Sequence, residues 1–450
     1  MKLEQVFGVS RDQVATYIER ETVDNALAIA LKETRQIIIY GSSKQGKTSL
    51  LHRHVKPESR VTVHCGPTTT AEDIYRSFLR QRDVQIVTEK SSSTSREMGT
   101  SISAKFTALI PFFGEGSAEA KGEAKAATKQ DEKRKAIEFN LANAQDVGEL
   151  LHQVEGSCVF FHVLENFHYL TDDVQRQMAF DLRTFEEMGL RFVILGVWRE
   201  RNRLVQYNGD LQDRIAEVPV EPWDKSDFQR ILDVGSDILR VTLSPEVGAR
   251  IFTEAHGSVA VVQELLKKVC ERAGITESIP DDKPAIHLSD LTQLQNAIED
   301  KVAEYAARHI RSLESIAAGS RARRTTEEIS ALFLPYHLVR VMVHRSYNEL
   351  KDGIERKTLQ QLIQDKHKTP DNVRTSDVTG MLSRLAALQA NQNIVPPLFD
   401  FDPGTRRLKV VDSTLYFFID NCDPEEVMAE IPHPDPDPVA QSTEDESSEA

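Results

Sequence analysis

Gly41-Ser42-Ser43-Lys44-Gln45-Gly46-Lys47-Thr48 is the most informative part of this chain. It matches the pattern GxxxxGK[ST] and lies between an apolar run that ends at Tyr40 and a helical pattern that continues through Ser49. The glycines let main-chain N–H groups approach triphosphate oxygens, and the N-terminus of the following helix adds partial positive charge. In such a loop the lysine, here Lys47, reaches the β- and γ-phosphates, and the hydroxyl of Thr48 ligates Mg²⁺. Residues 41–49 are therefore predicted to bind ATP and Mg²⁺.

Strand and helix patterns alternate on either side of this loop. Runs of strand length are found at Gln36–Tyr40, Arg60–Cys65, Cys158–Leu164, Arg191–Val197 and Arg214–Val220. Helical patterns are found at Val14–Thr34, Thr70–Arg82, Lys133–Val154 and Asp172–Met188. Strands separated by helices are typical of a parallel sheet covered on both faces. From Trp223 onward the strand patterns stop, and helical patterns follow as far as Ile316.

The segments outside this pattern indicate further units. Residues 88–130 are rich in small and charged residues, as in an insertion, and the basic run Arg321–Arg324 indicates a linker. Three helical patterns, at Pro335–Leu350, Arg356–Asp365 and Val373–Gln389, precede the hairpin turn at Asp402–Thr405. From Asp423 onward there are ten acidic residues and no Lys or Arg, which favours a solvated tail.

These patterns predict an α/β protein with a parallel-sheet P-loop NTPase core, a helical lid and a winged-helix-like domain. We place the core at residues 1–222, with an insertion at about 88–130, and the lid with its linker helix at 223–320. The winged-helix-like domain covers 335–422, and a disordered acidic tail covers 423–450.

Polar residues follow the predicted core strands at their ends. Glu165 is the candidate carboxylate for Mg²⁺ or its water. Asn166 stands where a glutamate would activate the attacking water, and an amide cannot take up a proton. Hydrolysis is then slow, or Glu165 serves alone, or His168 helps, with a structural role for His168 as the alternative.

Two arginines near strand ends are further candidates. Arg199 follows the strand Arg191–Val197 and either senses the γ-phosphate or is a surface cation. Arg214 precedes the last strand and either acts as an arginine finger in a neighbouring subunit or forms a salt bridge.

With these motifs the chain resembles AAA+ and STAND ATPases, above all the Orc1/Cdc6-like group, over about residues 14–272. Tyr17-Ile18-Glu19-Arg20-Glu21 is similar to the Y-x-x-R-E helix of that group, so the resemblance implies that Tyr17 and Arg20 help to hold adenine. Gly257-Ser258-Val259 resembles the start of the lid helix that carries sensor 2, although no arginine follows it closely. Glu165-Asn166 replaces the Asp-Glu pair of the group, and Arg199 is closer to the arginine of STAND proteins. The resemblance therefore implies a switch driven by ATP binding more securely than a motor.

Charge leaves the partner of the C-terminal domain open. The net charge of −15 argues against a general DNA-coating protein, but removing the tail leaves only −5. Residues 336–422 carry a net charge of +2, a weak basic balance for a DNA reader. Basic candidates there are Lys366, Lys368, Arg374, Arg384, Arg406 and Arg407. Both duplex DNA and a protein remain candidate partners, and a homo-oligomer is expected if Arg214 acts on a neighbour.

No apolar run has the length of a membrane-spanning helix, and residues 1–13 have no secretory pattern. We therefore expect a cytoplasmic protein. The leading hypothesis is an ATP-dependent molecular switch with slow hydrolysis. The alternatives are a DNA-binding ATPase in replication, transposition or antiphage defence, and a non-hydrolysing, nucleotide-responsive scaffold for other proteins.

Overall fold

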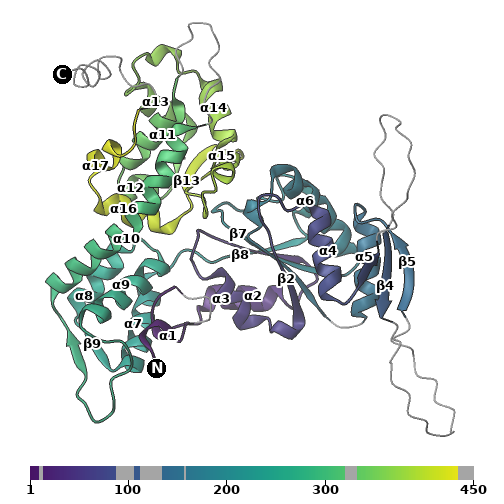
Figure 1. Cartoon of the computed structure of the whole chain (residues 1–450), viewed down its shortest axis with the longest axis horizontal. Helices are drawn as coiled ribbons and strands as arrows, with labels where there is room; N and C mark the ends of the chain where they lie inside the picture. The colour runs from purple at the N-terminus through teal and green to yellow at the C-terminus, as the bar shows by residue number, and fades with distance from the viewer. Residues whose placement is uncertain (10–13, 88–105, 112–133, 157–158, 320–331, 434–450) are drawn as a thin grey trace, which may run out of the picture.

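The computed structural model describes residues 1–9, 14–87, 106–111, 134–156, 159–319 and 332–433 (Figure 1). Its core contains a five-stranded parallel sheet with the strand order β2-β6-β7-β1-β8. The strands are β1 (Gln36–Tyr40), β2 (Arg60–His64), β6 (Phe161–Glu165), β7 (Arg191–Gly196) and β8 (Ile215–Pro219). The carboxyl end of β1, between β7 and β8, leads into the GxxxxGK[ST] loop, at the edge where open parallel sheets bind ligands. The predicted parallel-sheet P-loop core is confirmed.

Helices cover both faces of this sheet. Ile38 and Tyr40 of β1 pack with α4, α5 and α6, whereas Ile37 and Ile39 pack with α2 and α3 on the other face. These helices are α2 (Glu21–Ala30), α3 (Lys47–His54), α4 (Ala71–Gln81), α5 (Ala144–Glu155) and α6 (Asp172–Glu187). Because both faces are buried, the strands are apolar at nearly every position, which explains their continuous apolar runs in the sequence.

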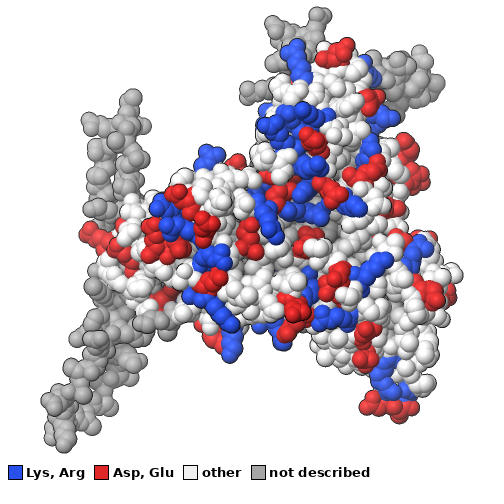
Figure 2. All heavy atoms as spheres, turned by 180° about the vertical axis from the view of Figure 1, so that it is seen from behind, with Lys and Arg blue, Asp and Glu red and all other residues white. Residues whose placement is uncertain are grey.

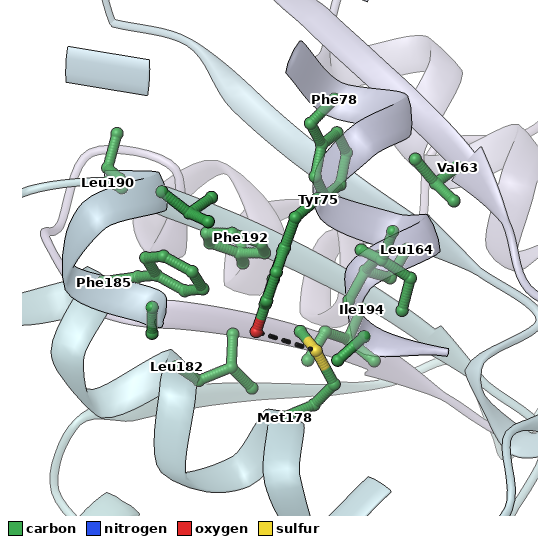
Figure 3. Packing of buried hydrophobic residues seen from close by; sticks show 14 of the residues in the cluster. Val63, Tyr75, Phe78, Leu164, Met178, Leu182, Phe185, Leu190, Phe192 and Ile194 are labelled. Atoms are coloured by element: carbon green, nitrogen blue, oxygen red, sulfur yellow. Dashed lines mark hydrogen bonds between the residues drawn. The ribbon is translucent and has the colours of Figure 1, made fainter. Parts of the chain in front are cut away.

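Aromatic rings fill the centre of the first face (Figure 3). Phe185 of α6 stacks on Phe192 of β7 at 4.8 Å between ring centroids, and Phe78 of α4 meets Phe192 edge-on at 5.8 Å. The buried Tyr75 hydroxyl donates to the sulfur of Met178 at 3.4 Å and to the carboxylate of Asp181. This packing fixes α4 and α6 on the sheet and so fixes the strand ends that carry the site.

Two of the predicted helices are shorter than expected. The helix predicted over Val14–Thr34 begins only at Glu21, because the Asp24 side chain accepts the Arg20 N–H at 2.7 Å and holds Arg20 in an extended conformation as the N-cap. The helix predicted from Lys133 begins at Ala144, with Asn143 as its N-cap. Residues 134–139 instead form a strand whose Ile137 and Phe139 pack against the core, with the two-residue period of a strand.

That strand belongs to a small antiparallel sheet beside the core. The sheet contains β3 (Gln85–Val87), β4 (Phe106–Pro111) and β5 (Arg134–Phe139). Of the insertion predicted at 88–130, only residues 106–111 are described, and they form β4. The remainder of that insertion, and the linker predicted at Arg321–Arg324, lie outside the described residues.

Residues 223–319, the described part of the lid predicted at 223–320, are mainly helical. Its helices are α7 (Lys225–Leu239), α8 (Pro245–Glu254), α9 (Val259–Arg272) and α10 (Leu291–Ala318), and α1 (Leu3–Val6) packs into the same cluster. The prediction that strands stop at Trp223 is wrong, because β9 (Val241–Leu243) and β10 (Ile286–Leu288) form a short parallel pair. Three residues are too few to show a period in the sequence.

The C-terminal unit, residues 332–433, lies above the lid in Figure 1. Its helices are α11 (Leu334–Val343), α12 (Tyr347–Leu350), α13 (Arg356–Gln364), α14 (Thr375–Ser383), α15 (Leu385–Asn391), α16 (Ser413–Asn421) and α17 (Pro424–Ala429). Its strands are β11 (Ile354–Glu355), β12 (Phe399–Asp402) and β13 (Arg407–Val410), in the order β11-β13-β12. The turn at 402–405 joins β12 to β13, and the Asp402 carboxylate accepts the N–H groups of Gly404 at 3.1 Å and Thr405 at 2.9 Å. Short 3-10 turns occur at Pro57–Ser59, Phe167–Tyr169, Gly209–Leu211 and Pro370–Asn372.

Three predictions in this unit need correction. The single helix predicted over Pro335–Leu350 is divided, because Ser346 and Glu349 form a reciprocal cap that starts α12. The helix predicted over Val373–Gln389 is divided into α14 and α15 at Arg384. The tail predicted to be disordered from 423 instead begins with α17, whose Val427 is buried together with Ile431. Residues 434–450 lie outside the described part.

The C-terminal unit is docked on both the lid and the core. Phe417 of α16 lies in the hydrophobic cluster of the lid. Arg203 of the core pairs with Asp400 of β12 at 2.7 Å, and Lys409 of β13 pairs with Glu200 at 2.5 Å. None of the described helices combines the length and apolar character needed to cross a membrane.

Candidate nucleotide-binding site

Residues 41–48 form a tight loop between β1 and α3. Gly46, the N-cap of α3, has a φ of 85°, in the left-handed region that favours glycine. A β-carbon on Gly41 would lie 2.6 Å from Cγ2 of Val220. Gly41 is therefore needed for close packing against the residue that follows β8. Residues 43–49 line a cavity of about 380 Å³ that extends to the lid. The geometry of the loop is therefore the one that the motif predicts.

Lys47 lies inside this loop. Its ammonium group donates to the carbonyl oxygens of Gly41 at 2.9 Å and Ser42 at 2.6 Å. Burial lowers the pKa of Lys47 to about 8, while the carboxylates of Glu221 and Glu165 act in the opposite direction. A phosphate beside the ammonium group would favour its charged form. Binding of a phosphate here would thus be coupled to the protonation of Lys47.

We expect the affinity for ATP to fall as the pH rises through 8. Free protein loses the Lys47 proton with a pKa of about 8, and the bound phosphate holds that proton, so binding above this pH requires proton uptake. Affinity should be greatest below pH 8 and about tenfold weaker at pH 9 than at pH 7. Titration calorimetry in two buffers of different ionisation enthalpy measures the uptake directly. Lys47→Arg, which stays charged over this range, should show a flat profile, and an equally flat profile for the wild-type protein would contradict the coupling.

The predicted metal-binding pair is close together. The Thr48 hydroxyl at the start of α3 donates to Oε1 of Glu165 at the end of β6 at 2.6 Å, and Oε2 of Glu165 lies 3.0 Å from Nδ1 of His64. A hydroxyl and a carboxylate beside the phosphates are the oxygen donors that Mg²⁺ prefers. The donor set therefore fits Mg²⁺, held by Thr48 directly and by Glu165 directly or through water. The ion would neutralise phosphate charge.

Asn166 and His168 follow Glu165 in a tight turn. Asn166 has a φ of 60°, in the left-handed region that asparagine tolerates, and is the N-cap of the short 3-10 turn Phe167–Tyr169. Both Asn166 and His168 line the nucleotide cavity. His168 Nδ1 accepts the N–H of Val197 at 3.3 Å, so the ring holds the end of β7, as the structural alternative predicts.

The N-terminal segment also lines the cavity. Tyr17 donates to the Asp24 carboxylate at 2.6 Å, and the Arg20 guanidinium lies 3.7 Å over the ring of Trp223 and donates to the carbonyl of Val220 at 2.9 Å. Tyr17, Arg20 and Trp223 all line the cavity, together with Ile231 and Gln263 of the lid. A flat aromatic and guanidinium surface of this kind can stack on a purine base. The structure thus places Tyr17 and Arg20 in a wall suited to the base, although they lie outside a helix.

The two strand-end arginines lie elsewhere. The Arg199 guanidinium donates to the carbonyl of Lys351 and to the Tyr416 hydroxyl, both at 3.0 Å, in a separate cavity of about 360 Å³ behind the loop. Arg199 therefore contacts the C-terminal unit and not the nucleotide cavity. Arg214 directly precedes β8 and pairs with Glu186. It therefore lies at the amino ends of the parallel strands, whereas the loop lies at their carboxyl ends. It is not part of the site of its own chain, and its role towards a neighbouring subunit stays a prediction.

Several site residues were not predicted from the sequence. Glu221 accepts the Ser42 N–H at 2.6 Å, and Gln45 accepts the N–H of Val259 at the start of α9 at 3.3 Å. Trp223 could have been suspected, since an aromatic residue follows the last core strand. The contacts of the C-terminal unit with Ser43 had no sequence signal, because Ser43 and Ser413 are 370 residues apart.

Comparison with known proteins gives only structural matches. No protein-family model matches the chain, and no curated protein matches it. The structure is similar to a Walker-type ATPase of Pyrococcus abyssi, with 14% identity, 90% of this chain and 96% of that chain covered, and a TM-score of 0.42. It is similar to the Aeropyrum pernix Orc1 protein in complex with DNA (14% identity, 98% of both chains, TM-score 0.39) and to Cdc6p of Pyrobaculum aerophilum (11%, 95% and 100%, 0.35). Other matched structures are of Thermotoga maritima RuvB, and at these values no residue role is transferred from any of the matches.

Proposed function

We propose that this protein is an ATP-dependent molecular switch of the AAA+ or STAND type, in which the C-terminal unit responds to the state of the phosphate loop. The observation that carries the proposal is the environment of Ser43. Its N–H donates to the carbonyl of Val411 at 2.8 Å, its hydroxyl donates to Asp412 at 3.2 Å, and its carbonyl accepts the Ser413 hydroxyl at 3.0 Å. Residues 411–413 of the C-terminal unit thus form hydrogen bonds with the N–H, the carbonyl and the hydroxyl of Ser43.

These contacts give the loop a mechanical connection to both other units. The Ser413 hydroxyl also accepts a hydrogen bond from the Ser258 hydroxyl of the lid at 3.0 Å, and the side-chain oxygen of Gln45 accepts the N–H of Val259. If the main-chain N–H groups of the loop turn towards a triphosphate, the hydrogen bonds of Ser43 with residues 411–413 and of Gln45 with Val259 must change. Binding energy at the loop can then shift the position of α16 and of the lid.

Slow hydrolysis is part of the proposal. Asn166 lies in the cavity where a general base is needed, and its amide cannot accept a proton. The Glu165 carboxylate accepts the Thr48 hydroxyl and lies beside His64. Its environment therefore suits a metal ligand better than a general base. The switch is then set by ATP binding and reset by occasional hydrolysis.

The test is to measure ATP binding and phosphate release by the whole chain, with and without duplex DNA. Tight binding with slow release that DNA leaves unchanged supports the switch. Release stimulated by DNA favours the DNA-binding ATPase, and binding with no release at all favours the scaffold. Failure to bind ATP at any concentration up to the millimolar range would rule out all three.

Duplex DNA is a second candidate partner, because a winged-helix-like domain is predicted here and the C-terminal unit has exposed arginines at 374, 384 and 406. The predicted wing is less available than expected, since Asp400 and Lys409 are paired with the core and Arg407 donates to the carbonyl of Gly353 at 3.0 Å. On the face shown in Figure 2, basic and acidic side chains are interspersed. DNA contact therefore depends on α14 and the tip of the hairpin.

We expect Arg374→Glu with Arg406→Glu to weaken binding to duplex DNA at least tenfold and to reduce its salt dependence, because each lost phosphate contact lowers the slope by about one. Fluorescence anisotropy over a range of salt concentrations measures both quantities. Arg250→Glu, an exposed arginine of the lid, is the matched control. Unchanged affinity and slope in the double variant would exclude this surface.

A further inference from the structure

His168 is the polar side chain of the nucleotide cavity whose chemistry is still unused. It lies in the 3-10 turn that follows β6, and the left-handed Asn166 directs this turn towards the end of β7. Its ring shares the cavity with Lys47, Thr48 and Asn166. The ring is also close enough to Lys47 for the lysine charge to help lower the pKa of His168.

The hydrogen bond at Nδ1 determines which ring nitrogen carries the proton. Nδ1 accepts the main-chain N–H of Val197 at 3.3 Å, so Nδ1 must be unprotonated. Burial, with the nearby charges of Lys47 and Arg203, lowers the pKa of His168 to about 3, so the ring is neutral at physiological pH. A neutral imidazole with an unprotonated Nδ1 has its proton on Nε2. His168 is thus a donor at Nε2.

This donor has no partner within the part of the chain that the structure describes. Nε2 of His168 is fully buried, and no described residue accepts a hydrogen bond from it. Buried N–H groups are almost always bonded to protein, water or ligand. The strand-end arginine that would otherwise contact a terminal phosphate, Arg199, is bonded to Lys351 and Tyr416 in the other cavity.

We propose that His168 donates its Nε2–H to an oxygen of the terminal phosphate of ATP and is the group that distinguishes ATP from ADP. This proposal rests on the proposed ATP binding. It assigns His168 a binding role and not the role of a general base, because the lone pair of Nδ1 is held by Val197 and Nε2 already carries a proton. No proton is transferred in this step.

Substitutions can separate the two ring nitrogens. His168→Asn places an oxygen near the position of Nδ1 but no N–H at the position of Nε2, and His168→Leu removes both functions at similar volume. His168→Gln restores an N–H near the position of Nε2. We expect His168→Asn and His168→Leu to weaken binding of the β,γ-imido analogue of ATP about tenfold with Mg²⁺ present, since hydrogen bonds to charged groups are the stronger ones. Affinity for ADP should change less than twofold, and His168→Gln should recover most of the loss.

Equilibrium binding of the analogue and of ADP to the whole chain measures this ratio, and His152→Asn, an exposed histidine on α5, is the matched control. An equal change for both nucleotides, or no change for either, overturns the role of His168 while the proposed function stands. Wild-type protein that binds neither nucleotide refutes the proposed function itself.

A second measurement on the wild-type protein does not depend on the folding of a variant. Nitrogen-15 spectra of the labelled histidine rings should include a ring that stays neutral and protonated at Nε2 between pH 5 and 8. The Nε2 signal of this ring should move on addition of the ATP analogue but not of ADP. If no such signal responds to the analogue, the proposal is overturned even if the His168 variants unfold.

Discussion

Lys47→Ala should reduce the affinity for ATP by about 30-fold or more and abolish any phosphate release. The ammonium group of Lys47 is buried in the loop, where it donates to Gly41 and Ser42. Truncating one partner of a buried charge pair costs about 2–5 kcal/mol, which is about 30-fold to several-thousandfold in affinity. Titration calorimetry with ATP and with ADP, together with a phosphate-release assay, measures both effects.

The control for this substitution is Lys56→Ala, an exposed lysine just after α3. It should bind ATP as the wild-type protein does. The Lys47→Ala protein should keep its fold, because the variant replaces a buried charge with a small apolar group, and thermal unfolding checks this. Wild-type affinity in a folded Lys47→Ala protein would contradict the assignment of the phosphate site.

Asp412→Ala should lower the free energy of unfolding by about 3–5 kcal/mol, the usual cost of removing one partner of a buried ion pair. Asp412 is fully buried and is the N-cap of α16, where it accepts the Thr414 N–H at 3.0 Å. It also accepts hydrogen bonds from Arg308 of α10 and from the Ser43 hydroxyl. Its removal therefore leaves the Arg308 cation without this partner and removes one of the three contacts between the C-terminal unit and Ser43.

Asp423→Ala is the matched control, because Asp423 caps α17 in the same way but is exposed. It should cost only about 1 kcal/mol, the value of an N-cap alone. Urea-induced unfolding of the three proteins measures the difference. If Asp412→Ala costs no more than Asp423→Ala, the contact with Ser43 and Arg308 contributes nothing beyond the cap.

The effect of Asp412 should depend on pH in a defined direction. Burial acts to raise the pKa of Asp412, but His309, Arg308 and Lys44 with the Thr414 hydrogen bond outweigh it, and the pKa is lowered. A carboxyl whose folded pKa is lowered stabilises the fold above its unfolded pKa of about 4 and loses this contribution as the pH falls further. The difference between wild type and Asp412→Ala should therefore be full at neutral pH and narrow below about pH 4.

Much of the core was predictable from the sequence because its signals are local. Both glycines of the loop at 41–48 have a positive φ, and Gly41 is also packed too closely for a side chain, so these requirements appear as residue identity. Strands buried on both faces appear as apolar runs, so the parallel sheet and the position of Glu165 opposite Thr48 followed from pattern alone. The errors fell where a capping side chain, such as Asp24 or Asn143, moved a helix boundary, or where a strand was only three residues long.

The arrangement of the units was decided only by the tertiary structure. Arg199 looked like a γ-phosphate sensor, yet Tyr416 and the Lys351 carbonyl bind it on the other side of the loop. Residues 411–413 have no motif, and their contact with Ser43 exists because α16 packs on α9 and α10 and brings its N-terminus to the loop. The amino-acid sequence by itself determined the phosphate loop, since backbone sterics and charge act within a few residues. Which distant groups meet that loop was settled by packing, since burial of apolar surface brings together residues that no local pattern connects.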